Sequence, residues 1–503
     1  MSSDAPPGYL GTDGRITSGP DEALVIAGYG LELADAPLLH DGLFLSDLAH
    51  VIGLSERGLI PGDVSARLLA AILDMSTIQA DEFPYDVRLG DAYNSREAEL
   101  VRRIGDVAGW VHLGRTRREA GRIAFRLAVR ELLLDLADAL DGLLEALVAR
   151  GNQTSEVIWA DSTYLQPAQP STFGHYLASF AEETARHIPR IHAAYDWMNT
   201  SPAGSGGVAG TRLGMDRALL AELLGFAVVG ANTRDTMWNV DGLIDAVGTA
   251  TQIAITCDRL AEDLQIFSSP GFGFVEIDAS LCRASVLLPQ KRNPYALAVV
   301  RSGASTLVGR LTGILVSART PSAQTDNWLH AYGEVSSSLA LAIRLTNLMA
   351  TTVRTLQVHG EAMELSAADP QVAATDLADE IVMRCGVDYR TAYRVVARAV
   401  ARSISHDEPI TLTSLDEAAH VVTGESLQPL RPGDLEITST MDARLLIRSR
   451  KEIGGCAPES VASELALLAT SATRSRAWTG EQRQRNSASR SRLIKQAELR
   501  SGR

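Results

Sequence analysis

Apolar residues recur at three- and four-residue spacing along several long stretches of this chain. The longest, residues 119–150, keeps this spacing for about nine turns of 3.6 residues each. Comparable patterns cover roughly 171–198, 242–267, 294–318 and 334–357. Each is much longer than the usual three-turn helix of a globular protein. Together they predict an all-α fold with a central bundle of long helices.

Shorter helical patterns lie on either side of this predicted bundle. One runs from Phe44 to Met75 with a break at 59–62, and others cover 375–387 and the region near 457–470. The start of the chain is rich in Gly, Pro, Ser and Asp, which predicts a loose arm. We therefore expect an arm at 1–20, an N-terminal helical domain at 21–118, the central bundle at 119–366, a C-terminal helical domain at 367–470 and a tail at 471–503.

The charge balance sets the tail apart from the rest of the chain. The whole chain carries a net charge of −14, which argues against nucleic acid as a partner, because phosphate binding needs a concentrated basic surface. Residues 471–503, in contrast, hold eight arginines and Lys495 against Glu481 and Glu498, a net charge of +7. A basic, serine-rich end is typical of a disordered segment, and an anionic partner is the alternative interpretation.

Composition and cysteine usage limit the class of protein further. Hydrophobic residues make up 46% of the chain and aromatic residues 5%, which favours helices packed with Leu, Ala and Val. The four cysteines are widely spaced and form no C-x-x-C pair, so we expect a reduced, cytoplasmic protein without structural zinc. We also expect no membrane span, no metal and no nucleotide cofactor, since the sequence shows no signal peptide, P-loop or G-x-G-x-x-G motif.

Two glycine-rich segments within the bundle region, 199–212 and 268–293, are too long to be simple connectors, and function tends to lie on such loops. The second leads into Ser285, Lys291 and Asn293, directly before a predicted long helix. A hydroxyl, an amine and an amide beside the free N–H groups of a helix N-terminus suit a bound carboxylate. The alternative is a polar helix cap with incidental charge.

Lys291 strengthens the case for a binding loop. The chain has three lysines among its 47 basic residues, and an arginine, Arg292, stands directly beside this one. A compact, flexible ammonium and a planar guanidinium are not interchangeable. The retained lysine therefore indicates that an ammonium is needed at this position.

Three motifs, in order along the chain, resemble the argininosuccinate lyase family of the fumarase/aspartase superfamily. Residues 289–294, Pro-Gln-Lys-Arg-Asn-Pro, are similar to the signature loop of that superfamily. Residues 163–170, Thr-Tyr-Leu-Gln-Pro-Ala-Gln-Pro, resemble the family's second conserved region, and residues 112–117, His-Leu-Gly-Arg-Thr-Arg, resemble its first. The resemblance extends over about 40–470.

This resemblance implies a three-domain, homotetrameric fold in which each active site combines three regions from three subunits. It implies a β-elimination that releases fumarate from an N-substituted aspartate, or the reverse addition of an amine. Ser285 matches the family's catalytic base, while Thr163, Lys291 and Asn293 match residues that hold the carboxylates of the fumarate part. Arg117 matches an arginine of the first region.

The chain departs from the family at the group that protonates the leaving nitrogen. Tyr164 stands where the family has a histidine, and Ala298 matches the glutamate that partners this histidine. Loss of both members together is coherent, because either one alone would be a stranded polar group. Three interpretations stay open: Tyr164 donates the proton, the leaving nitrogen needs no acid, or Tyr164 only fills space.

Further departures fall on the amine side of the expected pocket. Arg118 replaces an asparagine and Arg88 replaces a histidine, and both would favour an additional anionic group on the substrate if they face the pocket. Gln324, Leu329 and Tyr332 align with a tyrosine, a glutamine and a lysine that family members use near the amino-acid moiety.

Because the fumarate-side residues are retained, the sequence predicts a carbon–nitrogen lyase, or a synthase working in the addition direction, for an amine other than arginine in secondary metabolism. One alternative is a genuine argininosuccinate lyase. The other is a catalytically silent tetramer with a structural or regulatory role.

Overall fold

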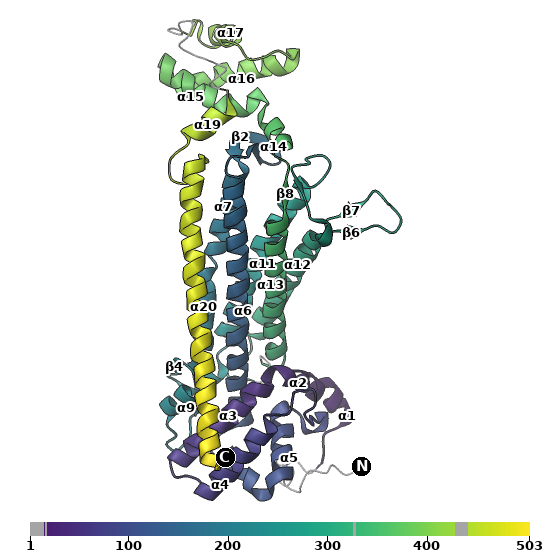
Figure 1. The fold of residues 1–503 in the computed structure, drawn as a ribbon, viewed down its shortest axis with the longest axis vertical. Coiled ribbons are helices and arrows are strands. Elements are labelled where there is room, and N and C mark those ends of the chain that lie inside the picture. The colour runs from purple at the N-terminus through teal and green to yellow at the C-terminus, as the bar shows by residue number, and fades with distance from the viewer. Residues whose placement is uncertain (1–14, 16–17, 325–327, 428–440) are drawn as a thin grey trace.

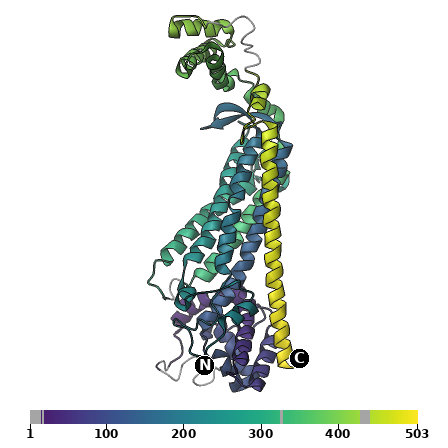
Figure 2. The same ribbon diagram turned by 90° about the vertical axis from the view of Figure 1, so that its left-hand side faces the viewer.

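The computed structural model describes residue 15 and residues 18–324, 328–427 and 441–503. The expected arm at 1–20 lies almost entirely outside the described residues. The described chain is mainly helical and forms three tiers along one long axis (Figures 1 and 2). None of the described helices is both long enough and apolar enough to cross a membrane.

The tier at one end consists mainly of N-terminal helices. The predicted break at 59–62 is confirmed, since one helix ends at Glu56 and the next begins at Gly62. The elements of this end are α1 (Glu22–Leu24), the π-helix η2 (Val25–Tyr29), α2 (Gly30–Ala34), α3 (Ala36–Glu56), α4 (Gly62–Met75), η3 (Val87–Leu89), α5 (Ala92–Ile104) and η4 (Gly105–His112), with α9 (Arg217–Leu223) and α10 (Thr233–Trp238) beside them.

The middle tier is the expected bundle, and its long helices are confirmed with one difference. The bundle contains α6 (Arg117–Gln153), α7 (Phe173–Ala185), α8 (Ile188–Met198), α11 (Asp241–Phe267), α12 (Tyr295–Ser317) and α13 (Ala331–Thr355). The stretch 171–198 forms two helices rather than one, because Pro189 lies in the first turn of α8 and cannot donate a hydrogen bond to a continuing helix. Leu133 and Leu140 of α6 and Leu339 of α13 are fully buried in the bundle core.

The tier at the other end has a small core of its own. Leu377, Val395 and Leu415 are completely buried there, one from each of three helices. The elements of this end are α14 (Gly360–Ala367), η6 (Pro370–Ala373), α15 (Ala374–Cys385), α16 (Tyr389–His406), α17 (Leu412–Thr423) and α19 (Ala443–Ser449).

Strands occur only as short pairs in the described part of the chain. The longest pair is the antiparallel hairpin of β1 (Ile158–Thr163) and β2 (Gln166–Thr172). The others pair β3 (Thr200–Ser201) with β4 (Val228–Val229), β5 (Val275–Glu276) with β8 (Gln357–Val358), and β6 (Arg283–Ala284) with β7 (Arg292–Asn293); the 3-10 turn η5 (Ala279–Leu281) precedes β6.

The expected disordered tail at 471–503 is wrong. These residues continue the final helix, α20 (Pro458–Ser501), which is 44 residues long and runs back along α6 to the N-terminal end (Figure 1, yellow). The final helix was expected to close the C-terminal domain at 470, but it packs on the bundle through Leu465 and Leu468 and on the N-terminal core through Leu493.

The composition of the buried face of α20 explains why the helix at 471–503 was not predicted. The buried positions of the former tail have helical spacing, but small or polar residues fill most of them, so hydropathy does not reveal the face. These positions are Ala472, Ser475, Thr479, Gln482, Ser489, Leu493 and Ala497. Arginines of α20 also pair with acids of α6, as in Arg476–Glu145 at 2.6 Å. Such half-exposed pairs contribute about 0–1 kcal/mol each, so apolar burial dominates the docking.

Leu493 therefore provides a test of whether the end of α20 is docked. Leu493→Ala should lower the free energy of unfolding by about 2–5 kcal/mol, because it leaves a cavity against the N-terminal core. Leu499→Ala, in the same helix but 68% exposed, is the matched control and should change it by less than about 0.5 kcal/mol. Urea unfolding measures both, and equal, negligible effects would mean that the segment does not pack.

Candidate active site

The loop that carries Ser285 lies between β6 and β7 and projects from the side of the bundle (Figure 1). The Ser285 hydroxyl oxygen accepts hydrogen bonds from the backbone N–H of Leu288 at 3.0 Å and, more weakly, of Leu287 at 3.4 Å. Donors aimed at an oxygen favour its deprotonated form, as a serine base requires.

Lys291 and Asn293 lie on the returning arm of the same loop. The Asn293 side chain donates to the Arg283 carbonyl at 2.9 Å, which joins the two arms, and Lys291 is exposed. Arg292 turns away to Glu276 and the Ile277 carbonyl. The hydroxyl, the amide and the ammonium are thus carried by one loop, while the neighbouring arginine is bound to the body of the protein.

Thr163 and Tyr164 lie at the tip of the β1–β2 hairpin. Thr163 pairs with Gln166, so Tyr164 and Leu165 form a two-residue turn with φ of 55° and 58°. Turns with two positive φ angles favour Asn-Gly, and other residues pay strain for them. The Tyr164 side chain is 99% exposed. An exposed aromatic ring on a strained turn indicates that Tyr164 contacts a ligand or another protein chain.

Arg117 and Arg118 begin α6 and line a small cavity of about 30 Å³. The cavity lies between the N-terminal tier and the start of α13. Its walls are Glu32, Asp35, Leu39, Leu43, Asp91, Ala92, Tyr93, Arg117, Arg118, Gly121, Trp328, Leu329 and Tyr332. The walls therefore combine apolar and aromatic surface with a few converging charges.

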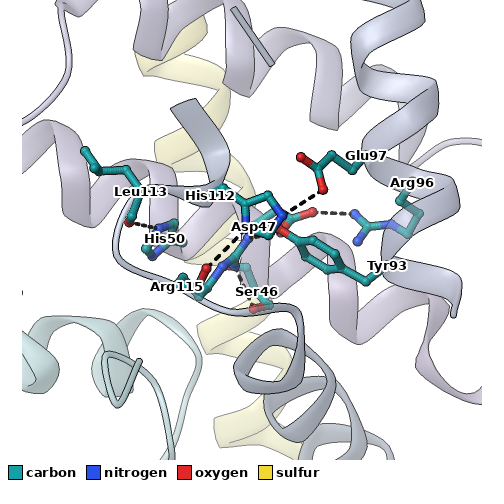
Figure 3. A network of polar contacts seen from close by, with 9 residues as sticks. All are labelled: Ser46, Asp47, His50, Tyr93, Arg96, Glu97, His112, Leu113 and Arg115. Atoms are coloured by element: carbon teal, nitrogen blue, oxygen red, sulfur yellow. Dashed lines mark hydrogen bonds and ion pairs between the residues drawn. The ribbon is translucent and has the colours of Figure 1, made fainter. Parts of the chain in front are cut away.

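A buried ionic network holds the turn that precedes Arg117 and α6 (Figure 3). Asp47 on α3 binds Arg96 at 2.7 Å and Arg115 at 2.5 Å, and Arg115 also donates to the carbonyl and hydroxyl of Ser46 at 3.0 Å. Burial opposes ionisation of Asp47, but the two guanidinium charges outweigh it and hold the pKa of this carboxyl below its usual value. Loss of any one of these three side chains would leave a buried charge without its partner, which is costly. The network therefore holds the turn before α6 in place.

His112, in the first of the three motifs, belongs to the same network. Its Nε2 lies 2.8 Å from Glu97 and its Nδ1 lies 3.2 Å from the Arg115 carbonyl (Figure 3). The hydrogen bond that protonated His112 donates to Glu97 raises the pKa of the histidine. The histidine therefore supports the turn rather than lining the cavity.

Glu119 ties the first glycine-rich segment to α6. Its two carboxylate oxygens accept the backbone N–H groups of Gly204 and Gly206 at 2.7 and 2.5 Å. Burial raises the pKa of Glu119 to about 7, although these two bonds oppose the rise. The segment 199–212 is thereby packed beside the cavity as a support, and this role was not predicted.

The charges of the cavity are paired in a specific way. Arg118 binds Glu32 at 2.9 Å, and Arg117 lies 3.7 Å from Asp91. Asp35 forms no ion pair within the described residues; burial, followed by the nearby Glu32, raises the pKa of Asp35 to about 7. Sequence reasoning missed Glu32 and Asp35, because no spacing rule connects them with an arginine more than eighty residues later.

Two further sequence candidates lie outside the cavity. Arg88 is exposed and lies 3.6 Å from Glu22, so it is a surface residue. Gln324 is exposed and does not line the cavity within the described part of the chain. The described residues also contain no cluster of His, Cys, Asp or Glu that could hold a metal ion.

One chain does not bring the three motif regions together. Arg117 is the first residue of α6, whose 37 residues span about 55 Å, and Thr163 follows beyond its far end. The Ser285 loop leaves the bundle at a third place (Figure 1). Within a single chain, the predicted site residues are therefore three separate groups.

Comparison with known proteins agrees with the three motifs. A family described as "Lyase" matches residues 54–309, and one described as "Argininosuccinate lyase C-terminal" matches residues 371–433. An argininosuccinate lyase of Methanothrix thermoacetophila is 32% identical over 84% of this chain and 85% of that protein. Argininosuccinate lyase 1 of Mesorhizobium japonicum is 30% identical over 90% of this chain and 95% of that protein.

Solved structures give the same result. The crystal structure of EDDS lyase in complex with formate superimposes with a TM-score of 0.85 at 28% identity and covers 96% of both chains. An EDDS lyase variant with bound fumarate gives 0.85 at 27% identity and covers 99% of both. The fold and the site regions thus define a fumarase/aspartase-type enzyme. The chain belongs to the argininosuccinate lyase family of that superfamily and is a carbon–nitrogen lyase.

The strained hairpin turn can be tested by relieving it. The double variant Tyr164→Asn, Leu165→Gly should raise the free energy of unfolding by about 1–2 kcal/mol, because these residues adopt positive φ at lower cost. It should also reduce turnover, if the ring is placed for function. Tyr164→Phe, which keeps the ring and the strain, should leave stability unchanged. Thermal unfolding and lyase assays measure the two effects, and a double variant without added stability would refute the strain.

Proposed function

We propose that this enzyme eliminates fumarate from an N-substituted aspartate, or adds an amine to fumarate, and that its amine is not arginine. The observation that carries this proposal is the Ser285 loop, in which a hydroxyl accepts two backbone N–H groups beside Lys291. We further propose that it serves secondary metabolism in the cytoplasm, in keeping with its four free cysteines.

In the elimination, the Ser285 alkoxide takes the proton from the carbon beside the carboxylate. The electron pair of that C–H bond first moves onto the carboxylate. It then forms the double bond of fumarate as the C–N bond breaks with its electrons going to nitrogen, which takes up a proton. The intermediate is a dianionic aci-carboxylate, which needs fixed positive charge and hydrogen-bond donors. Lys291, Asn293 and Thr163 supply an ammonium, an amide and a hydroxyl for this purpose. A variant of EDDS lyase with bound fumarate supports a dicarboxylate ligand for this chain as well.

We also propose that the enzyme is a homotetramer with composite sites. The separation of Arg117, Thr163 and Ser285 within one chain supports this proposal, since only other copies can unite them. The exposed Tyr164 and the apolar loop tip support it too, because Val286 and Leu287 are 109% and 82% exposed. Apolar side chains presented in this way mark an interaction site.

The residues expected near the leaving amine support a substrate other than argininosuccinate. Tyr164 and Ala298 replace the family's proton-donating pair, and Arg118 brings a guanidinium to the cavity wall. The solved relatives of similar length carry the name of another substrate, EDDS, so the fold serves more than one amine. Tyr164, at the exposed hairpin tip, is the candidate donor to the leaving nitrogen. The second candidate function, argininosuccinate lyase activity, is favoured by 30–32% identity to enzymes of that name.

Ser285 can be tested as the base by following fumarate in ultraviolet absorbance against a panel of amines that includes arginine. Ser285→Ala should lower turnover by at least about a hundredfold, because the base is removed. Ser280→Ala is the matched control, since the Ser280 hydroxyl donates to Asp278 in an exposed turn and the variant should keep full activity. An unchanged rate in Ser285→Ala would exclude this serine as the base, and the amine that reacts decides between the two candidate functions.

Composite sites can be tested by mixing two inactive variants. Ser285→Ala and Arg117→Ala remove residues that one chain holds far apart. In mixed tetramers made by co-expression, random assembly should restore about a quarter of the native sites. Each variant expressed alone should stay inactive. Full inactivity of the mixture, with tetramers present by sedimentation, would show that a single chain supplies both residues of a site.

A further inference from the structure

The basic end of the chain, residues 471–503, lies on α20 and takes no part in the proposed chemistry. Five of its eight arginines pair with acids of α3, α4 or α6. These are Arg476, Arg483, Arg490, Arg500 and Arg503. Arg485 lies 3.7 Å from Glu481 of its own helix, and Arg474 and Arg492 form no ion pair within the described residues. Most of the basic charge is thus neutralised within the chain, which leaves no continuous basic surface for nucleic acid.

Two of the three remaining arginines, Arg485 and Arg492, line a cavity of about 490 Å³. The cavity lies between α20, the end of α9 and the turn at 225–227, beside the N-terminal tier (Figure 1). Seven residues separate the two arginines, so they lie on one face of the helix, two turns apart. Arg492 donates through Nη2 to the Ser489 hydroxyl at 2.9 Å, one turn nearer to Arg485. Both guanidinium groups therefore border the same space.

Two buried amides line the same cavity, and the chain leaves their N–H groups unbonded. Asn199 and Gln482 are 7% and 8% exposed. The Asn199 oxygen accepts from Arg130 at 2.6 Å and from the Ala227 N–H at 3.3 Å, so its NH₂ group faces the other way. Neither that NH₂ group nor the Gln482 amide has a hydrogen-bond partner among the residues that the structure describes. A buried amide in this state is costly unless water or a ligand bonds to it.

The walls of this cavity are therefore rich in hydrogen-bond donors and positive charge. Glu222 is the single acid among the described residues that line it. Guanidinium groups match the geometry of phosphate and carboxylate oxygens. Two guanidiniums and two amides offer more donors than the two oxygens of a carboxylate can use, whereas a phosphate group has more acceptor oxygens. Phe226 and Ala488 add apolar surface beside these donors, which suits the organic part of a phosphate ester.

We propose that this cavity is a second binding site, for a phosphate group, and that Arg485, Arg492, Asn199 and Gln482 hold the phosphate oxygens. Arg492 carries most of the binding, because it brings a guanidinium without a carboxylate partner. The bound anion joins α20 to the end of α9 and to the turn at 225–227. The site is separate from the Ser285 loop, and it gives the basic composition of 471–503 a small anionic ligand.

Isothermal titration of the full chain with inorganic phosphate, at constant ionic strength, tests the site. Native enzyme should bind one phosphate per chain in a saturable way. Arg492→Gln should weaken binding at least about tenfold, because it removes a charged donor. Gln482→Leu, which keeps most of the volume, should weaken it about three- to tenfold. Arg474→Gln is the matched control: Arg474 is an exposed, unpaired arginine of α20 outside the cavity, and binding should change by less than about twofold.

Glycerol 3-phosphate distinguishes the two sources of the phosphate group. Tighter binding than inorganic phosphate, lost in Arg492→Gln, would identify a phosphate ester whose organic part contacts Phe226. Weaker binding would identify free phosphate as the ligand. Thermal unfolding is the second readout, since a ligand that binds the folded chain raises the unfolding midpoint. Phosphate should raise it more than potassium chloride of the same ionic strength in native enzyme, and no more than the chloride in Arg492→Gln.

The Ser285 loop could also attract phosphate, through its exposed ammonium. Lys291→Met removes that ammonium and should keep the phosphate binding of native enzyme. Loss of binding in Lys291→Met but not in Arg492→Gln would assign the phosphate to the loop and overturn the proposal. Absence of saturable binding to native enzyme, or equal affinity in native enzyme and Arg492→Gln, would overturn it as well.

Discussion

The length of α6 is the constraint on which the rest of this structure depends. A single uninterrupted helix begins with Arg117 and ends ten residues before Thr163, about 55 Å away. A rigid rod cannot bring its two ends into one pocket. The composite site that we propose would unite them through other copies of the chain, and the exposed Tyr164 ring and Val286 loop tip are the surfaces that such an assembly would bury.

The length of α6 also separates the candidate site into two parts: the cavity at the start of the helix, and the serine loop with the hairpin tip. The cavity at the start of α6 is built on the buried Asp47 network, where Arg96 and Arg115 share one carboxylate. The serine loop and the hairpin tip have few contacts with their own chain. In the proposed composite site, the cavity is therefore formed before assembly, and the neighbouring copy would supply the serine loop. Preorganisation of the binding half lowers the cost of aligning the reacting atoms.

Much of the fold could be predicted from the sequence, because long apolar periodicity leaves few alternatives to a bundle. The end of α20 could not, since Ser475, Thr479 and Ser489 fill buried positions and their packing depends on the partner face of α6. For the candidate site, the motifs predicted the serine loop, the hairpin tip and Arg117, and these stay predictions. The pairing of Arg118 with Glu32 and the bond from Arg122 to Tyr332 depend on three-dimensional contacts that no sequence spacing encodes.

Most charged groups of the cavity wall are paired with a group of opposite charge. Glu32 and Asp91 are matched by Arg118 and Arg117, which leaves one acid, Asp35, and one cation behind the wall, Arg122. The stacking of Arg122 on Trp328 contributes about 2 kcal/mol when desolvated, less than the several kcal/mol that burial of an unpaired ion costs. The hydrogen bonds from Arg122 to the Met237 carbonyl and the Tyr332 hydroxyl oxygen offset the remaining cost. Arg126 is buried in the same way and donates to the carbonyls of Thr200 and Thr236, so neutral acceptors take the place of counter-ions along this face of α6.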